Sequence, residues 1–153
     1  MGDVVLRQGT RKDALPLARL MYEYDMYEHS LDTDSEPDSF KKHLKDVSSF
    51  LRTGKYKHTL IEENGKIVGL VNWTIDRANG VKRGCLCNLV ITHSARGKGY
   101  GTILVDWLLA YFKKHKCTQV RSFVKFKNTK AQKFWKKQGF DFSEQGYHIT
   151  KRL

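Results

Sequence analysis

The chain has 153 residues, of which 28 are Lys or Arg and 16 are Asp or Glu, so its formal net charge is +12. With 40% hydrophobic residues it is too apolar to be disordered, and its length suits one domain over residues 1–153. No apolar run reaches the length of a membrane span, and the first residues do not resemble a signal peptide. We therefore expect a cytoplasmic protein with no membrane partner. The positive charge keeps nucleic-acid binding open as an alternative.

The first part of the chain is expected to hold one short strand and two helices. Residues 4–7 are β-prone, and Thr10 followed by Asp13 is typical of a helix start, which predicts a helix up to about Tyr27. The acidic stretch that continues to Asp38 is expected to be a loop. A second helix follows, because apolar residues recur at helical spacing and a glycine comes after them. These residues are Phe40, Leu44, Val47, Phe50 and Leu51, followed by Gly54.

Two Asn-Gly pairs predict tight hairpin turns, because both central positions of such a turn need positive φ. Asn64-Gly65 lies between candidate strands at residues 58–62 and 66–74. Asn79-Gly80 leads into a third candidate strand at residues 84–92. The pattern predicts three consecutive antiparallel strands.

The end of the chain repeats the alternation of strand and helix. Residues 119–124 are β-prone, and Asn128 is typical of a helix cap. Two last strands are expected at residues 140–143 and 147–151, with a turn at residues 145–146. Together with one long helix described next, the order is βααβββαβαββ, which indicates an α/β protein with a mixed sheet.

A glycine-rich turn, Arg96-Gly97-Lys98-Gly99-Tyr100-Gly101, follows the third hairpin strand. The segment after it is apolar at helical spacing, so the turn leads from a strand into a helix. The first N–H groups of a helix have no intrahelical partner, and glycines let a backbone approach a ligand closely. This combination favours an anion site, usually for phosphate. The glycine spacing matches neither the Walker A loop nor the dinucleotide fingerprint.

Two motifs resemble those of the GNAT superfamily of acyl-CoA-dependent N-acyltransferases. The first is Arg96-x-x-Gly99-x-Gly101, which is similar to the family pattern [QR]-x-x-G-x-[GA]. The second is Asn128-x-x-Ala131-x-x-Phe134-Trp135-x-x-x-Gly139-Phe140. The resemblance implies acetyl-CoA or a longer acyl-CoA as cosubstrate, and a mostly antiparallel sheet that splays at the cofactor site; no metal is expected. The region from Phe134 onward is also similar in outline to diamine and polyamine N-acetyltransferases.

The resemblance further implies how the donor is held. Backbone N–H groups of the turn would bind the pyrophosphate, and the preceding strand would pair with the pantetheine amides. An N–H near Ile91 would polarise the thioester carbonyl. Asn128 would contact the cofactor arm, and Lys125, Lys127 and Lys130 are candidates for the 3′-phosphate. The expected donor contacts are Leu89, Val90, Ile91, Arg96, Gly97, Lys98, Gly99, Tyr100, Gly101, Thr102, Asn128, Lys130, Ala131, Phe134 and Trp135.

The usual catalytic side chains of the family are replaced in this chain. Acyl transfer requires a neutral amine, so an alkylammonium group, with a pKa of about 10, must lose a proton. Many family members place a carboxylate before the glycine turn and a Tyr after the Phe of the second motif. Here Cys87 and Asn88 stand at the first place and Trp135 at the second, and none is a useful base or acid. Catalysis could rest on positioning with water as base, on groups from elsewhere, or be slight in a protein that only binds CoA.

The candidate replacement groups are Asp25, Glu28, His93 and Tyr147. Seven carboxylates lie within residues 23–38, without a Lys or Arg. They predict a cationic primary amine as acceptor: a polyamine, a lysine-like peptide amine or an aminoglycoside. We do not expect nucleic acid as a partner, because a basic binding domain would leave the glycine turn unexplained. The resemblance permits a homodimer, and the cysteines and histidines lack metal-ligand spacing.

Overall fold

The computed structural model describes residues 2–33, 36–143 and 148–153. The strands are β1 (Val4–Gln8), β2 (Lys57–Glu63), β3 (Lys66–Ala78), β4 (Val81–Ile91), β5 (Gln119–Phe123), β6 (Asp141–Phe142) and β7 (His148–Arg152). The helices are α1 (Ala14–Leu31), α2 (Phe40–Thr53), α3 (Tyr100–Lys114) and α4 (Thr129–Lys137), with short 3₁₀ turns η1 (Arg11–Asp13) and η2 (His93–Ala95). This order confirms the predicted βααβββαβαββ arrangement. The turn expected at residues 145–146 lies outside the described residues.

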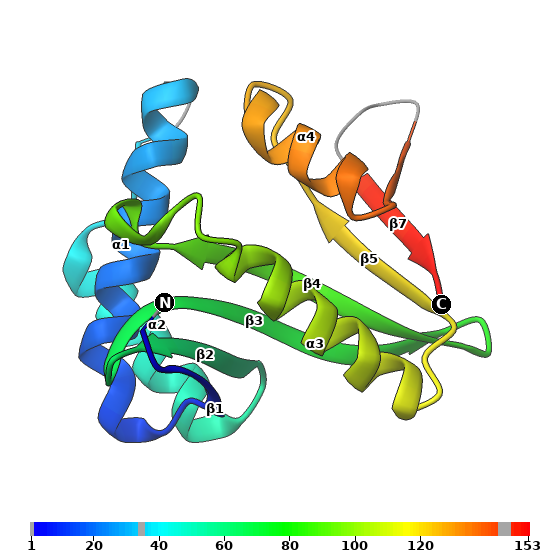
Figure 1. The fold of residues 1–153 in the computed structure, drawn as a ribbon, viewed down its shortest axis with the longest axis horizontal. Coiled ribbons are helices and arrows are strands. Elements are labelled where there is room, and N and C mark those ends of the chain that lie inside the picture. The colour runs from blue at the N-terminus through cyan, green and yellow to red at the C-terminus, as the bar shows by residue number, and fades with distance from the viewer. Residues whose placement is uncertain (1, 34–35, 144–147) are drawn as a thin grey trace.

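The strands form one sheet in the order β1-β2-β3-β4-β5-β7-β6, with helices on both faces (Figure 1). Every neighbouring pair is antiparallel except β4 and β5. The mixed, mostly antiparallel sheet predicted from the sequence is therefore confirmed. No helix within the described residues is both long and apolar enough to cross a membrane.

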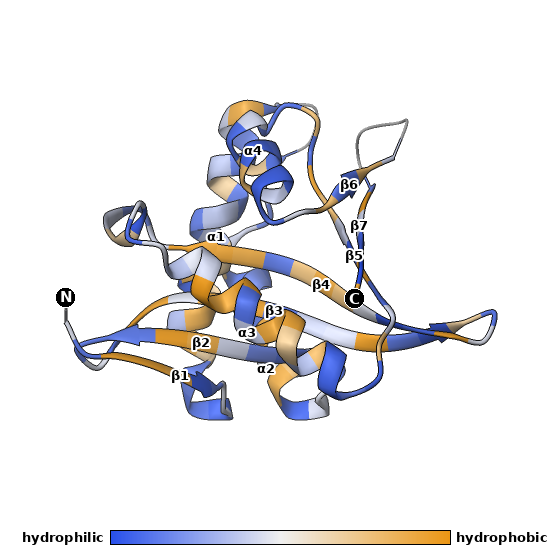
Figure 2. Cartoon of the chain, turned by 45° about the vertical axis from the view of Figure 1, so that its right-hand side comes forward, coloured by the Kyte–Doolittle hydropathy of each residue, from blue (hydrophilic) through white to orange (hydrophobic). Residues whose placement is uncertain are grey.

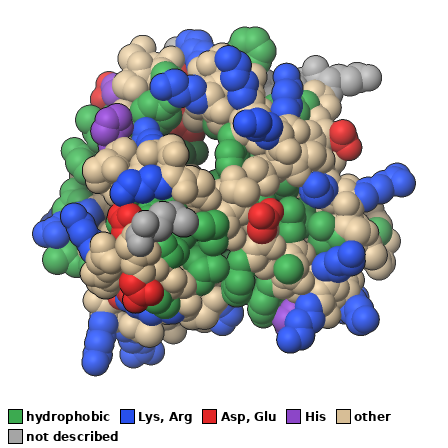
Figure 3. All heavy atoms as spheres, viewed as in Figure 1, with side chains coloured by type: hydrophobic (Ala, Val, Ile, Leu, Met, Phe, Trp, Pro, Cys, Tyr) green, Lys and Arg blue, Asp and Glu red, His purple; other side chains and the backbone are tan. Residues whose placement is uncertain are grey.

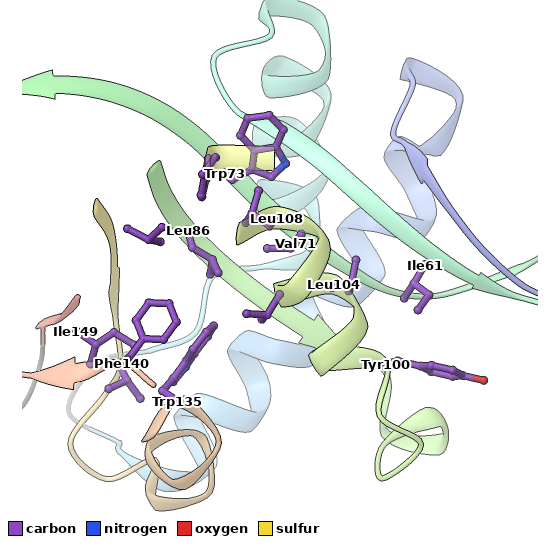
Figure 4. Packing of buried hydrophobic residues seen from close by; sticks show 14 of the residues in the cluster. Ile61, Val71, Trp73, Leu86, Tyr100, Leu104, Leu108, Trp135, Phe140 and Ile149 are labelled. Atoms are coloured by element: carbon purple, nitrogen blue, oxygen red, sulfur yellow. The ribbon is translucent and has the colours of Figure 1, made fainter. Parts of the chain in front are cut away.

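Two apolar cores lie on opposite faces of the sheet. On one face, α3 places Leu104 and Leu108 against Val71 of β3, and Figure 4 shows these side chains together. On the other face, α1 and α2 cover a separate cluster that includes Leu60 of β2. Its neighbour Ile61 belongs to the α3 side, because successive side chains of a strand point to opposite faces. Burying both faces fixes the register of the central strands.

Both Asn-Gly turns have the predicted backbone conformation. Asn64 and Asn79 have φ of 51°, and Gly65 and Gly80 have φ of 77°. The second hairpin is longer than predicted, since β3 and β4 continue to the turn itself. Residues near this turn are hydrophilic, as Figure 2 shows, so hydrophobic alternation did not reveal them as strand. Antiparallel backbone pairing continues along them as far as residues 78 and 81.

The first helix is also longer than predicted. It ends at Leu31 rather than near Tyr27, so the loop expected for the acidic stretch is wrong for residues 28–31. One physical reason for the longer helix is a contact between residues one helical turn apart. The Tyr24 hydroxyl donates a hydrogen bond to the Glu28 carboxylate. The extension includes Glu28 in the last turn of the helix, where this residue is 3% exposed.

The sheet opens between β4 and β5. Residues 83–85 of β4 pair with residues 119–121 of β5, and the ladder then stops. At that point the Ser122 hydroxyl donates to the Leu86 carbonyl at 2.8 Å, so a side chain replaces the next backbone pair. On the β3 side the register skips Cys87, which makes this residue a β-bulge. A bulge bends its strand, and β4 and β5 diverge beyond it (Figure 1).

Candidate active site

The divergence of β4 and β5 leaves a cavity of about 430 Å³. Its walls come from the end of β4, the glycine turn, α1 and α4. Figure 3 shows an opening in the upper part of the molecule, with hydrophobic side chains at its walls. All the donor contacts expected from the sequence border this cavity except Lys98.

The backbone of β4 presents an unpaired edge to the cavity. The Thr92 N–H donates to the Val68 carbonyl at 2.8 Å, and Ile91 lies opposite Gly69. In an antiparallel ladder the direction of the N–H and C=O groups alternates from residue to residue. The N–H groups of Leu89 and Ile91 therefore point away from β3, into the gap that β5 has left. Such an edge can accept an extended amide chain as an additional strand.

The glycine turn is an open cradle at the start of α3. Gly97 and Gly99 have φ of 78° and 84°, a conformation that favours glycine. Apart from the adjoining residues of the chain, no atom of the described residues lies within 4 Å of where a Cβ at either position would be, so this space is open. The free N–H groups at the start of the 15-residue helix α3 add partial positive charge. The site therefore fits a phosphate-bearing donor such as acetyl-CoA.

Lys98 turns away from the cavity. Its ammonium group lies 3.0 Å from the carboxylate of Glu63, at the end of β2. The same carboxylate accepts a hydrogen bond from the Tyr100 hydroxyl at 2.5 Å. These two contacts hold the pKa of Glu63 below its ordinary value. Lys98 and Tyr100 thus fasten the glycine turn to the sheet, and Figure 4 shows the Tyr100 hydroxyl at the edge of the core.

The three positions where the sequence lacks the usual base and acid all border the cavity: Cys87, Asn88 and Trp135. Cys87 as a residue is exposed, but the surrounding protein partly desolvates its thiol. This desolvation raises the pKa of the thiol to about 11. It is therefore protonated at neutral pH. Trp135 is 5% exposed and packs edge-to-face against Phe134 and Phe140, each with ring centroids 5.0 Å away. None of the three supplies a base.

Glu28 is the carboxylate that the structure brings to the cavity. One of its oxygens accepts the hydrogen bond from Tyr24, and Oε2 has no hydrogen-bond partner among the described residues. Burial and the contact with Glu28 raise the pKa of Tyr24 above its ordinary range, so this phenol stays protonated. Tyr24 and Tyr27 border the cavity but were not predicted as site residues. Tyr24 lies one helical turn before Glu28, and this spacing was the available signal.

The other catalytic candidates lie elsewhere. Asp25 is outside the cavity wall, where its Oδ2 lies 2.9 Å from His43 Nε2 and accepts the Asp38 N–H at 2.8 Å. His93 is exposed and does not border the cavity. Tyr147 lies outside the described residues.

The second motif forms the opposite wall through α4. Asn128 is 5% exposed and caps this helix, since its Oδ1 accepts the Ala131 N–H at 3.1 Å. Lys130 and Phe134 border the cavity from the same helix. Ser122, which had no sequence signal, closes the inner end of the opening.

An open strand edge and a helix N-terminus meet at one cavity, and this arrangement suits an acyl-CoA donor, as in acyltransferases. The chain belongs to the acetyltransferase (GNAT) family, whose model matches residues 19–140. Acetyl-CoA is therefore its cosubstrate, and N-acetyl transfer is its reaction.

Solved structures support the fold. An acetyltransferase from Thermus thermophilus is 19% identical, with a TM-score of 0.80 over 100% of both chains. The PaiA N-acetyltransferase of Thermoplasma acidophilum, in complex with coenzyme A, is 15% identical, with a TM-score of 0.78 over 99% of both chains. Arabidopsis thaliana Naa50, in complex with a bisubstrate analogue, is 19% identical, with a TM-score of 0.70 over 98% of this chain and 99% of that one. A sequence comparison with curated proteins gives no significant match.

Proposed function

We propose that the protein transfers the acetyl group of acetyl-CoA to a primary amine of a cationic acceptor, such as a polyamine, a lysine side chain or an aminoglycoside. Glu28 carries this proposal. Glu28 is 3% exposed and borders the cavity, and one oxygen of its carboxylate has no partner among the described residues. A buried carboxylate oxygen is costly without a partner, and an ammonium group supplies the missing donor.

The electrostatics of α1 support the same choice. Glu28 lies in the last turn of α1, and the C-terminal end of a helix carries partial negative charge. A cation is therefore attracted to the α1 side of the cavity, while the phosphates of the donor are attracted to the start of α3.

In the proposed mechanism, the two sides hold the reactants next to each other. The N–H groups of Leu89 and Ile91 bind the donor chain, and that of Ile91 polarises the thioester carbonyl. The ammonium group first loses one proton to Glu28 Oε2, directly or through water, and the neutral amine nitrogen then bonds to the carbonyl carbon. The C–S bond breaks, and CoA leaves as the thiolate, which takes up the second proton of the amine nitrogen and becomes the thiol. Tyr24 orients this carboxylate through its hydrogen bond.

The test is an acceptor screen that follows the release of CoA thiol and identifies the acetylated product by mass spectrometry. Spermidine, a lysine peptide and an aminoglycoside are compared with a neutral amide. The variant Glu28→Gln removes the charge in the cavity. Asp46→Asn, an exposed carboxylate of α2 that pairs with Lys42, is the matched control.

We expect Glu28→Gln to lower kcat/KM for the preferred cationic amine by at least about tenfold, because a hydrogen bond to a charged group contributes about 1.5–3 kcal/mol. Asp46→Asn should act like the wild type. Equal rates for Glu28→Gln and wild type would overturn the role of Glu28. Acetyl-CoA binding without thiol release for any amine would favour a CoA-binding protein with little turnover.

A further inference from the structure

Glu23 connects α1 to the segment that leads into the glycine turn. Its Oε2 accepts a hydrogen bond from the Thr92 hydroxyl at 2.9 Å, and its Oε1 accepts the His93 N–H at 2.7 Å. These partners lie 69 and 70 positions further along the chain. Neither Glu23 nor these contacts belong to the cavity wall, so their role is separate from that of Glu28.

The two hydrogen bonds of Glu23 take the place of an N-terminal cap for the 3₁₀ turn η2. Thr92 precedes the 3₁₀ turn η2, at the position where a Thr side chain usually accepts a hydrogen bond from the backbone of the turn. Here the Thr92 side chain makes no such bond. Instead, the Thr92 hydroxyl donates a hydrogen bond to Glu23. Glu23 also accepts a hydrogen bond from the first backbone N–H of η2, which belongs to His93. A carboxylate of α1 therefore caps the turn through which β4 enters the glycine turn.

Arg96 extends this connection. Its Nε–H donates to the Ile91 carbonyl at 3.0 Å, and its guanidinium lies 5.1 Å from the centre of the Tyr27 ring. Its Nη2 is 3.9 Å from Glu23 Oε1, which is the distance of a loose ion pair. The first residue of the glycine motif is thus held between the end of β4 and α1.

We propose that Glu23 is a positioning residue for acetyl-CoA. By fastening η2 to α1, it sets the direction in which the glycine turn presents its N–H groups to the donor phosphates. Glu28 lies on the same helix, five residues further on. The contact therefore also fixes the donor loop relative to the helix that borders the cavity on the acceptor side.

Charge and positioning predict opposite effects for the loss of this carboxylate. Glu23 is negative and lies next to the loop that receives negatively charged phosphates, so its charge alone weakens donor binding. If charge dominated, Glu23→Gln would bind acetyl-CoA more tightly, and the gain would be larger at low salt. If positioning dominates, the same variant binds acetyl-CoA more weakly at every salt concentration.

The experiment measures acetyl-CoA binding by titration calorimetry, with no acceptor present. We expect Glu23→Ala to raise the dissociation constant about tenfold, because two hydrogen bonds to a charged group are lost at a partly exposed site. Glu23→Gln retains a carbonyl that can accept the His93 N–H, so its loss should be smaller. Asp46→Asn is the control for the removal of a negative charge. Unchanged or tighter binding by Glu23→Ala would overturn the proposal.

Two further readouts separate positioning from general damage. At saturating acetyl-CoA, kcat of Glu23→Ala with its amine should change less than KM for acetyl-CoA. In amide NMR spectra, the signals of His93, Gly97 and Gly99 should shift, while those of the hairpin glycines Gly65 and Gly80 stay in place. Shifts spread evenly over both regions would contradict a local role. Because the calorimetry uses no amine, its outcome does not depend on the proposed acceptor.

Discussion

His58 should make the stability of the protein depend on pH. It is 3% exposed, and neither ring nitrogen has a hydrogen-bond partner among the described residues. It borders a second cavity of about 300 Å³, between β2 and the end of α2. Burial lowers the pKa of its imidazole from 6.5 to about 4, and the nearby backbone of Tyr56 offsets only part of this effect.

The direction of the pH effect on stability follows from the protonation of His58 in the folded and the unfolded chain. Between pH 6.5 and 4 the unfolded chain binds a proton at this imidazole, and the folded chain does not. The folded state is therefore most stable above pH 6.5, relative to the unfolded state, and loses stability as the pH falls toward 4. A difference of about 2.5 pKa units corresponds to about 3 kcal/mol, at about 1.4 kcal/mol per unit.

The variant His58→Phe keeps a ring at this position and removes the titrating group. Urea unfolding at several pH values from 7.5 to about 4 gives the free energy of unfolding of both proteins. Titrating carboxylates affect both curves alike, so the difference between them isolates His58. The wild type should lose about 3 kcal/mol more than the variant over this interval. Parallel curves would refute the assignment of a buried, neutral imidazole.

Three more predictions concern the start of α3, the packing of β4 against α3, and the cap of α4. Gly101→Ala places a Cβ 3.6 Å from the Phe134 ring, an ordinary contact, and the family pattern accepts Ala at this position. Urea unfolding should therefore show equal or greater stability, by up to about 1 kcal/mol, and calorimetry should show acetyl-CoA binding like that of the wild type, so clearly weaker binding would contradict this open contact. Gly84→Ala places a Cβ 2.3 Å from the buried Phe112 ring and should lower the free energy of unfolding by about 1–3 kcal/mol or more, so an unchanged urea midpoint would contradict this packing. Asn128→Ala removes the cap of α4 and should cost about 1 kcal/mol in the same assay, and no loss would mean that Asn128 does not cap the helix.

Local chemistry explains why much of the fold was predictable. The Asn64 and Asn79 turns need positive φ at two successive residues, and few sequences other than Asn-Gly meet that need. In the glycine turn, Gly97 and Gly99 also have positive φ, a conformation that glycine adopts without strain. Where the conformation depends on a few adjacent residues, the sequence alone predicted the structure.

Contacts between distant residues explain what the sequence did not reveal. The end of α1 was misplaced because its acidic residues resemble a loop, whereas Glu28 is buried against Tyr24 in the folded protein. Ser122 has no motif, and its role appears only where β4 and β5 separate. Glu23 caps a turn 70 positions away, which no local pattern encodes. The site therefore depends on the register of the sheet as much as on its two motifs.

In the proposed reaction, acetyl-CoA and a cationic amine meet in the cavity between β4 and β5, and the acetyl group passes directly from one to the other. A single-turnover reaction tests this most directly: the protein is loaded with acetyl-CoA and mixed with excess amine from the screen. Direct transfer predicts that free CoA thiol and acetylated amine appear together in equal amounts. Thiol without acetylated amine, or neither product for any amine of the screen, would contradict it.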